Sequence, residues 1–325
     1  MLRLGSAWYD VASQVKAITE LGLDSRHFVL CTDDSHSGTL VNDGHMNRVV
    51  RHVIAQGLNP ITAIQMATLN AAEHFGLDKE IGSITPGRLA DIVISSDLPT
   101  LPIEVVISAG QVVAENGRLT IDLPPYPYPK LATGTVRLAR QLNALDFDLP
   151  APNPQPASVR VIGVIENQAP TRAETRVLPV DKGVLQLDSR QDVAHLALVE
   201  RHKGSGNVVN GFVSGFGFDA PCAIASTVAH DCHHMVIAGT SKSNMAQAAN
   251  RLAEIGGGVI VIREGQEIAL IELPIAGLMS DERAEIVAAK AERMVKAFQE
   301  CGCHLNNAFM QLCLISLAVI PELRI

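Results

Sequence analysis

The residues in this sequence best suited to chemistry are two adjacent aspartates, Asp33 and Asp34, which end the apolar run HFVLCT at residues 27–32. A carboxylate at the C-terminal end of a buried strand can ligate a metal ion or take a proton from a metal-bound water. Two neighbouring carboxylates repel each other unless a metal or an arginine compensates their charge. The same residues would also suit a simple cap on the following loop or helix. The pattern therefore indicates either a metal centre at this strand end or a capped turn.

A second cluster lies in the stretch AHDCHH, which places His230, Asp231, His233 and His234 within five positions. Histidine is the commonest transition-metal ligand, and an aspartate can orient it. If residues 228–239 are extended, His230 and His234 share one face of the strand and His233 occupies the other. That alternation weakens the case for a single metal site. Two interpretations stay open: a lining for the entrance of an active site, or a polar network that holds a loop.

Several other residues carry weaker signals. His36 and His45 follow the apolar run and could contact a substrate, although a capping or solvent-facing role is favoured. Gly215 and Gly217 in SGFGF resemble part of a glycine-rich phosphate loop, but a complete GxGxxG is absent and a turn is favoured.

The six cysteines form no CxxC pair and several sit in apolar stretches. They indicate buried thiols in a reducing cytoplasm. Cys301 and Cys303 flank a single glycine, where an ordinary loop is favoured over a bridge or a metal site.

Composition excludes several classes of partner. The net charge is −8 and no run of lysine and arginine occurs, which argues against nucleic acid or an anionic membrane as a partner. The longest apolar runs are too short or too interrupted to span a bilayer, and the first ten residues lack the features of a signal peptide. We therefore expect a globular cytoplasmic protein.

The elements that must position the two aspartates are predicted from periodicity. Apolar residues recur at helical spacing over residues 8–22, 42–57 and 60–75, with Pro60 suited to opening the third helix. The stretches ADIVISS, EVVISAG and QVVAENG then indicate short strands separated by turns.

Residues 121–157 change in character, because eight of the 17 prolines fall between Pro124 and Pro156. Proline removes backbone donors, so this segment is expected to be a linker, interrupted by a short helix near 134–145, with a domain boundary near residue 155. Beyond it we expect strands at VRVIGVI, VAHLALVE, CAIASTV and HHMVIAG. Amphipathic helices are expected over 242–255 and 281–299, with a hairpin turning at Glu264–Gly265.

These motifs resemble a known family. The stretch from LCTDDSHSG to AAEHFGL is similar to the last barrel strand and following helices of the adenine deaminases, in the amidohydrolase superfamily. IGSITPGRLADIVISS resembles the superfamily's return to a small β-domain. GFGFDAPCAIASTVAHDCHHMVIAG, LPIAGLMSDE and LISLAVIPEL resemble the C-terminal domain specific to adenine deaminases.

The resemblance implies a fold that is α/β plus α+β. Residues 1–80 would form the last strands and helices of a metal-dependent (β/α)8 TIM barrel, and 81–120 a segment of the small β-domain. Residues 121–157 would be the proline-rich linker, and 158–325 the C-terminal domain. The family's HxH pair is absent, and MLRLGSAWYDVASQV looks like the seventh strand and its helix. We therefore expect the N-terminal half of the barrel to be missing and this chain alone to be inactive.

The resemblance also implies a chemistry. Asp33 matches the last-strand metal ligand, which would take a proton from a metal-bound water as that water attacks C6 of adenine, giving hypoxanthine and ammonia. The metal would be manganese or iron, with zinc possible, and its remaining ligands are expected outside this chain. Asp34, His36, His230, Asp231, His233 and His234 are candidates for contacts with substrate or with the ligands. The full-length parent is expected to be a homo-oligomer.

Two alternatives remain. The chain could be a non-catalytic fragment or assembly module, or it could come from another amidohydrolase, such as a cytosine-deaminase-like or dihydroorotase-like enzyme. The cytidine-deaminase fold is disfavoured, because Pro221–Cys222 is not followed by the second cysteine of its signature.

Overall fold

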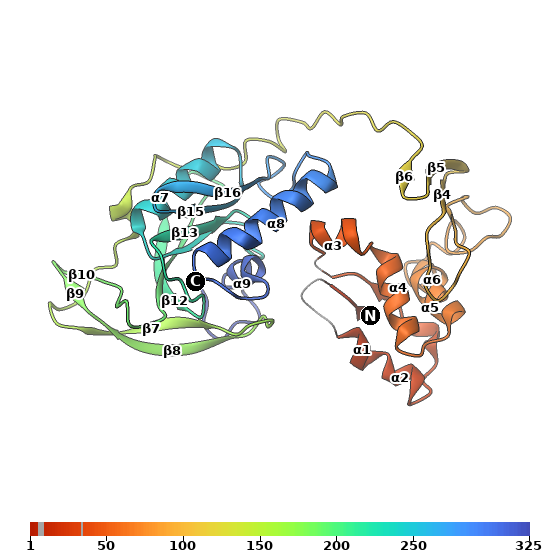
Figure 1. The fold of residues 1–325 in the computed structure, drawn as a ribbon, viewed down its shortest axis with the longest axis horizontal. Coiled ribbons are helices and arrows are strands. Elements are labelled where there is room, and N and C mark those ends of the chain that lie inside the picture. Colours follow the sequence, from red (N-terminus) through yellow and green to blue (C-terminus); the bar gives the residue numbers. More distant parts are fainter. Residues whose placement is uncertain (6–9, 34) are drawn as a thin grey trace. The chain divides into compact units, whose positions relative to one another are not determined.

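The computed structural model describes residues 1–5, 10–33 and 35–325 (Figure 1). The chain divides into two compact units, residues 1–126 and 127–325, which we call unit 1 and unit 2. The boundary thus lies at Tyr126–Pro127 rather than near residue 155, and most of the expected linker, from residue 127 onwards, groups with unit 2.

Unit 1 begins with two short parallel strands, in which Leu2 pairs with Leu30 and Arg3 with Cys31. Helices lie between and after these strands. The elements are β1 (Leu2–Arg3), α1 (Val11–Gln14), α2 (Lys16–Thr19), the 3-10 turn η1 (Ser25–His27), β2 (Leu30–Cys31), α3 (Ser37–Asn42), α4 (Met46–Ala55), α5 (Pro60–Ala67) and α6 (Leu69–His74). Apolar side chains of this region share one core, which includes Leu4, Val15, Val49, Val53 and Met66.

The helices of unit 1 are shorter than the periodicity predicts. The helix expected over 42–57 is α4, preceded by the separate α3, and the one expected over 60–75 is divided between α5 and α6. Asn59 caps α5 by accepting hydrogen bonds from the backbone N–H groups of Ile61 and Thr62. The break falls at Thr68, whose φ of −131° and ψ of −87° are not helical.

The remainder of unit 1 contains a four-stranded antiparallel sheet; three of its strands lie in the stretches expected to be strands, and the fourth, Arg118–Leu119, was not predicted. Its strands run in the order β3 (Ile92–Ile94), β4 (Val105–Ser108), β5 (Gln111–Glu115) and β6 (Arg118–Leu119).

Unit 2 is built on an eight-stranded mixed sheet with the order β16-β15-β13-β14-β11-β12-β7-β8. All neighbours are antiparallel except β12 and β7. The strands are β7 (Ala157–Val164), β8 (Thr171–Leu178), β11 (Ala194–Val199), β12 (Val208–Ser214), β13 (Cys222–Ser226), β14 (Met235–Gly239), β15 (Gly258–Arg263) and β16 (Gln266–Glu272). A small hairpin, β9 (Val180–Asp181) with β10 (Val184–Leu185), lies apart from this sheet.

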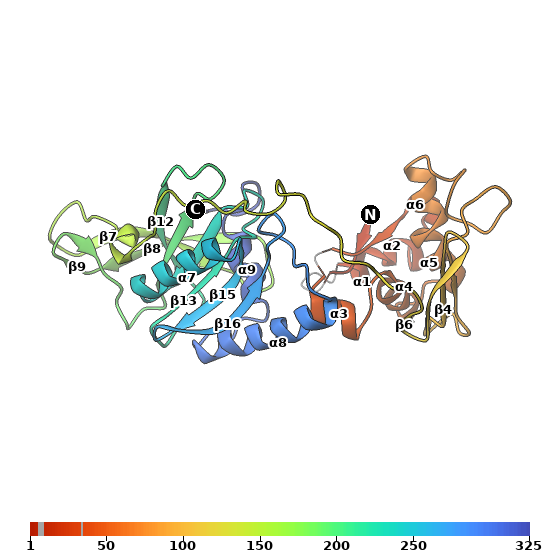
Figure 2. The ribbon, with the colours of Figure 1, turned by 90° about the horizontal axis from the view of Figure 1, so that it is seen from above.

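Helices cover both faces of this sheet, so that unit 2 has three layers (Figure 2). Helix α7 (Lys242–Glu254) packs on one face, where Met245 and Leu252 share a core with Ile260 and Ile262. Helices α8 (Ala284–Glu300) and α9 (Ala308–Leu314) pack on the other, sharing a core that contains Val259 and Val261. Alternate residues of β15 therefore serve opposite cores, as the two-residue period of a strand requires.

The pattern beyond residue 155 matches the structure where the periodicity is strong. Helix α7 and the hairpin that turns at Glu264–Gly265 are as expected. Helix α8 begins at Ala284, three residues later than predicted. In place of the helix expected near 134–145, the structure has only the 3-10 turn η2 (Ala144–Phe147), while β8, β12 and α9 were not predicted.

Candidate functional site

Asp33 lies two residues beyond the end of β2, beside the neighbouring strand β1. Arg3, on β1, directs its guanidinium at this carboxylate: Nη1 of Arg3 donates to Oδ2 of Asp33 at 2.7 Å. The two residues are brought together because Arg3 pairs in register with Cys31, so the side chains at these two strand ends emerge side by side. Asp33 is partly buried, with 23% of its side chain exposed.

Arg3 also binds a second carboxylate. Its Nε and Nη2 each lie 3.3 Å from Oδ2 of Asp10, which directly precedes α1. Burial lowers the pKa of the Arg3 guanidinium, but the charges and hydrogen bonds of Asp33 and Asp10 outweigh burial and leave the pKa above its usual value. Burial also raises the pKa of the Cys31 thiol, and the charge of Asp33 adds to that rise. Arg3 is thus the positive group that an acidic strand end requires, and sequence reasoning missed it.

The neighbouring candidates do not all converge on Asp33. His36 is the N-cap residue of α3 but makes no side-chain capping bond to it. His45 precedes α4, and its Nε2 lies 3.4 Å from Oγ1 of Thr32, the residue before Asp33. Asp34 lies outside the described residues.

The described residues do not offer a resident metal ion a complete set of donors. Within residues 1–5, 10–33 and 35–325, no three His, Cys, Asp or Glu side chains are arranged to hold a metal ion. Asp33 is the candidate ligand in unit 1, and its carboxylate is engaged by Arg3. These residues therefore do not fit a metal by themselves.

The AHDCHH segment is not extended, so the alternation of faces considered for residues 228–239 does not apply to it. Residues 230–232 form a turn, and β14 begins only at Met235. Nδ1 of His230 lies 3.4 Å from Oδ1 of Asp231, and the rings of His230 and His233 are 6.4 Å apart. Nδ1 of His233 lies 2.7 Å from the Val228 carbonyl oxygen.

The fourth histidine of the segment faces a different neighbour. The ring of His234 lies 4.7 Å from that of His202. Burial lowers the pKa of His234, and the nearby His202 lowers it further. The four side chains therefore make local contacts and do not form one metal site.

A buried arginine holds this segment in place. Arg201 is 1% exposed. Its Nε donates to the His233 carbonyl at 2.6 Å, while Nη2 donates to the carbonyls of Thr227 and Ala276 at 3.3 and 3.1 Å. Burial lowers the pKa of the Arg201 guanidinium. Sequence reasoning missed Arg201, because nothing in its neighbours marks an arginine after a strand as buried.

The remaining candidates have structural roles. The backbone N–H groups of Gly215 and Gly217 donate to the carboxylate of Asp192 at 2.8 and 3.0 Å, so this loop binds the protein's own anion. Cys301 and Cys303 are free thiols buried in the core beneath α8, and burial raises the pKa of Cys303 to about 11.

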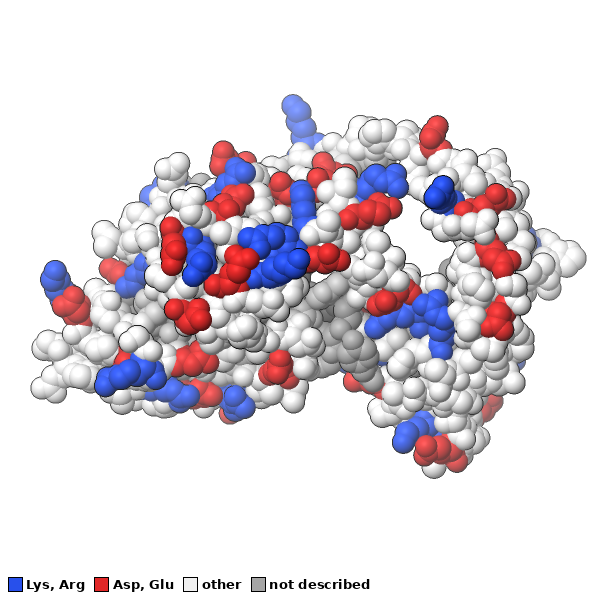
Figure 3. Space-filling view, in the orientation of Figure 1, with Lys and Arg blue, Asp and Glu red and all other residues white. Residues whose placement is uncertain are grey.

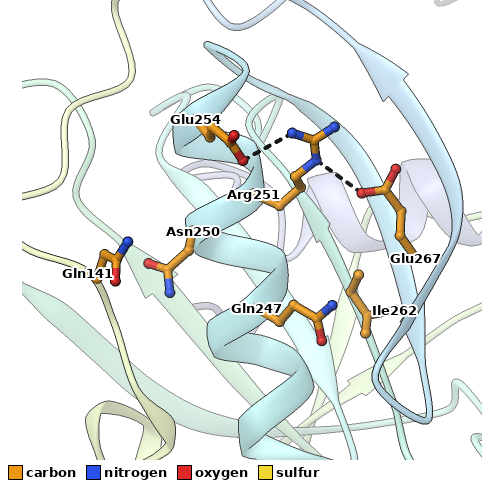
Figure 4. A pocket seen from close by; sticks show the side chains of 7 residues that line it. All are labelled: Gln141, Gln247, Asn250, Arg251, Glu254, Ile262 and Glu267. Carbon is orange, nitrogen blue, oxygen red and sulfur yellow. Dashed lines mark hydrogen bonds and ion pairs between the residues drawn. The ribbon is translucent and has the colours of Figure 1, made fainter.

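Unit 2 also has a hollow of about 280 Å³ along the outer face of α7 (Figure 4). Arg251 bridges two carboxylates there, with Nη1 3.0 Å from Glu254 and Nε 3.1 Å from Glu267. The amide of Asn250 is taken up by the backbone of Leu142. The polar side chains of Arg251 and Asn250 in this hollow are thus already paired within the protein. Basic and acidic side chains are interspersed on the face seen in Figure 3. On α8, for example, Lys290 forms ion pairs with Glu272 and Glu282.

None of the helices in the described ranges is both long enough and apolar enough to cross a membrane.

Two family models match this chain. Residues 9–113 match the amidohydrolase family, and residues 168–325 match the adenine deaminase C-terminal domain. The first part of the chain is thus similar to the amidohydrolases, and the last part is similar to the C-terminal domain of adenine deaminases.

Curated relatives identify the family more closely. The chain is 65% identical to adenine deaminase 3 of Rhizobium meliloti, over all of this chain and 55% of the relative. It is 62% identical to an adenine deaminase of Mesorhizobium japonicum and 61% identical to one of Paracoccus denitrificans, over all of this chain and 54% of each. The chain is similar to adenine deaminases along its whole length and spans about half the length of the curated relatives it matches.

A crystal structure of an amidohydrolase from Thermotoga maritima aligns with 35% of this chain and 43% of its own, at 19% identity and a TM-score of 0.21. That score is too low to support any comparison of folds.

Proposed function

We propose that this chain is part of an adenine deaminase, which hydrolyses adenine to hypoxanthine and ammonia. The observation that carries the proposal is the identity of 65%, 62% and 61% to curated adenine deaminases along the whole chain. The match of residues 168–325 to the adenine deaminase C-terminal domain supports this substrate over those of other amidohydrolases.

In this proposal β1 and β2 are the last two strands of an amidohydrolase barrel. Their parallel pairing, with α1 and α2 between them, supports this assignment, because barrel strands are parallel and connected through helices. Asp33 follows the C-terminal end of β2, at the end of the strands where barrel enzymes carry their active sites.

The chain's own contribution to the reaction is then the Asp33 carboxylate. Water adds its oxygen to C6 of adenine, the bond from C6 to the exocyclic nitrogen breaks, and the amino group leaves as ammonia. Asp33 accepts a proton from the water and returns it to the departing nitrogen, which balances the reaction. Arg3 holds this carboxylate in place at 2.7 Å. Asp34, His36, His230, Asp231, His233 and His234 are kept as candidates for contacts to the substrate.

The family implies a divalent metal, with manganese or iron favoured over zinc. Such an ion supplies Lewis-acid chemistry. Asp33 would be one ligand, and the other ligands would have to come from outside the described residues, which hold no three-ligand group.

The test is ammonia release from adenine by this chain together with the separately produced barrel segment of the Rhizobium meliloti relative, with Mn(II), Fe(II) or Zn(II) added. Adenine should be deaminated while cytosine and dihydroorotate are left unchanged. Turnover of cytosine or dihydroorotate in place of adenine would assign the chain to another amidohydrolase.

A second candidate is a non-catalytic assembly module. One observation favours it: the residues described here offer a single candidate ligand, already paired with Arg3. An assembled protein that binds metal but leaves all three substrates untouched would favour this alternative.

A further inference from the structure

We propose that Arg3 keeps divalent cations away from Asp33 in this chain, because its guanidinium is the built-in counter-ion of that carboxylate. The family implies a metal ion beside Asp33, whereas in this structure Nη1 of Arg3 binds the carboxylate at 2.7 Å. The choice of metal rests on the proposed function, but the competition between the two cations concerns the described residues alone.

The strand pair fixes where the Arg3 side chain points. Leu2 and Leu4, which flank it on β1, are 3% and 1% exposed and lie in the core of unit 1. Because side chains alternate along a strand, Arg3 leaves β1 on the opposite side. Arg3 pairs in register with Cys31, and its guanidinium reaches Asp33 two residues further along. The pairing of the two strands therefore brings this cation to the carboxylate.

A second carboxylate binds a different edge of the guanidinium. Asp10 is the N-cap residue of α1, yet its side chain makes no capping hydrogen bond. Its Oδ2 instead lies 3.3 Å from both Nε and Nη2 of Arg3, which leaves Nη1 for Asp33. An N-cap aspartate normally stabilises its own helix through such a bond. Asp10 therefore holds the guanidinium in place rather than capping α1.

The guanidinium competes with a metal ion in two ways. The Asp33 oxygen that accepts a hydrogen bond from Nη1 has part of its acceptor capacity occupied. The positive charge of Arg3 also repels a divalent cation next to that oxygen. Without the guanidinium, Asp10 and Asp33 would lose the cation that they share, and carboxylate oxygens are ligands that Mn(II) prefers.

Arg3 is then a positioning residue that acts through Asp33. In the proposed function Asp33 is a metal ligand, so the strength of the pair between Arg3 and Asp33 sets how tightly that metal is held. Arg3 lies 30 residues from Asp33 in the sequence and reaches it only through the pairing of β1 with β2.

The experiment is a titration of the full chain with Mn(II), in which electron paramagnetic resonance measures the free ion. We expect the wild-type chain to bind Mn(II) weakly and Arg3→Gln to bind it about tenfold more tightly or better. Adding Asp33→Asn to that variant should abolish the gain. Equal affinities of the wild type and Arg3→Gln would overturn the proposal, as would a gain that persists in the double variant.

Two further variants are the controls. Arg3→Lys keeps a positive charge beside Asp33, so it should bind Mn(II) as the wild type does. Arg26→Gln removes a guanidinium that binds Glu73 in the same unit at 2.7 and 2.8 Å, and it should also leave the affinity unchanged. A similar gain in Arg26→Gln would assign the effect to net charge and overturn the role of Arg3.

A measurement on the wild-type chain keeps the proposal testable if circular dichroism shows that Arg3→Gln does not fold. The NMR signal of the Arg3 Nε–H group should persist at millimolar Mn(II), because the paramagnetic ion stays away from Asp33. Selective broadening of that signal would show that the ion binds beside Arg3 and would overturn the proposal.

Failure of this inference and failure of the proposed function are distinguishable, because the titration measures no turnover. A gain of affinity in Arg3→Gln, with an assembled protein that releases no ammonia from adenine, supports the role of Arg3 and counts against the proposed function. Ammonia release with unchanged affinity in Arg3→Gln does the reverse.

Discussion

Nη1 of Arg3 lies 2.7 Å from Oδ2 of Asp33, so a cation from one parallel strand neutralises the carboxylate that ends its neighbour. The same guanidinium reaches Asp10 at 3.3 Å. One guanidinium is therefore shared between two carboxylates, which offsets part of the negative charge at this strand end. If Asp33 ligates a metal in the assembled enzyme, it must do so while sharing or exchanging the contact with Arg3.

Replacing Asp33 tests its role in the assembled protein. We expect Asp33→Asn to lower the rate of ammonia release from adenine by roughly 10²–10⁴-fold, the range over which a general base contributes. Asp10→Asn is the matched control, because it removes the other carboxylate from Arg3 and should retain most of the activity. Initial rates of both variants, measured beside the wild type, decide the question, and equal loss in the two would assign Asp33 a purely structural role.

His195, on β11, should make the stability of unit 2 dependent on pH. It is 5% exposed, its Nδ1 has no hydrogen-bond partner in the described part of the chain, and burial lowers its pKa to about 4, with Lys242 lowering it further and Asp148 opposing. In the unfolded chain the His195 imidazole takes up a proton below about pH 6.5, whereas in the folded chain it does so only near pH 4. Stability should therefore fall as the pH drops through this window, by about 3 kcal/mol.

Urea denaturation at pH 7 and at pH 4.5 measures this dependence. His195→Leu should reduce the difference in unfolding free energy between the two pH values, while His304→Leu, at an exposed position, should leave it unchanged. An unaltered difference in His195→Leu would contradict the assignment.

Arg201 should be among the most sensitive residues of unit 2. Arg201→Met removes donors to the carbonyls of Thr227, His233 and Ala276 and leaves them buried, which should cost about 3 kcal/mol or more. The side chain of Arg190 is 86% exposed, so the control substitution Arg190→Met should change stability by less than about 1 kcal/mol. Thermal unfolding of the two variants provides the comparison, and similar melting temperatures would show that Arg201 is dispensable.

Two glycines should respond in opposite directions to alanine. A Cβ on Gly239 would lie 2.4 Å from the Cys222 carbonyl oxygen and 2.8 Å from Cα of Ala223, inside the central sheet. Gly239→Ala should therefore destabilise unit 2 by about 1–3 kcal/mol. Gly38, within α3, has no atom within 4 Å of its Cβ position, so Gly38→Ala should stabilise unit 1 by about 0.5–1 kcal/mol. Chemical denaturation of each variant gives both signs, and a stabilised Gly239→Ala would refute the packing described here.

The helices and strands that could be predicted from the sequence are those whose signals come from residues close together along the chain. Helix α7 and the hairpin at Glu264–Gly265 were predictable, because their signals are local: an amphipathic period and a glycine turn. Strand β8 was missed because it is an edge strand, TRAETRVL, whose alternating charges carry no continuous apolar run. The break at Thr68 was missed because the apolar pattern continues across it.

In the candidate site, too, local signals could be predicted and contacts between distant residues could not. Asp33 was recognised from its position after an apolar run, but its partner Arg3 is 30 residues away and becomes a neighbour only when β1 pairs with β2. The AHDCHH cluster was located by composition, yet its turn at residues 230–232 and its anchoring by Arg201 depend on contacts between distant segments. Composition locates such groups, and tertiary pairing decides what they touch.

In the proposed function, this chain contributes Asp33 to an active site whose other metal ligands lie outside the described residues. The most direct measurement is the metal content of the purified chain, produced alone with Mn(II) or Fe(II) supplied, together with its ammonia release from adenine. We expect well under one equivalent of metal per chain and no ammonia. One or more equivalents of bound metal, with ammonia release abolished by Asp33→Asn, would contradict it.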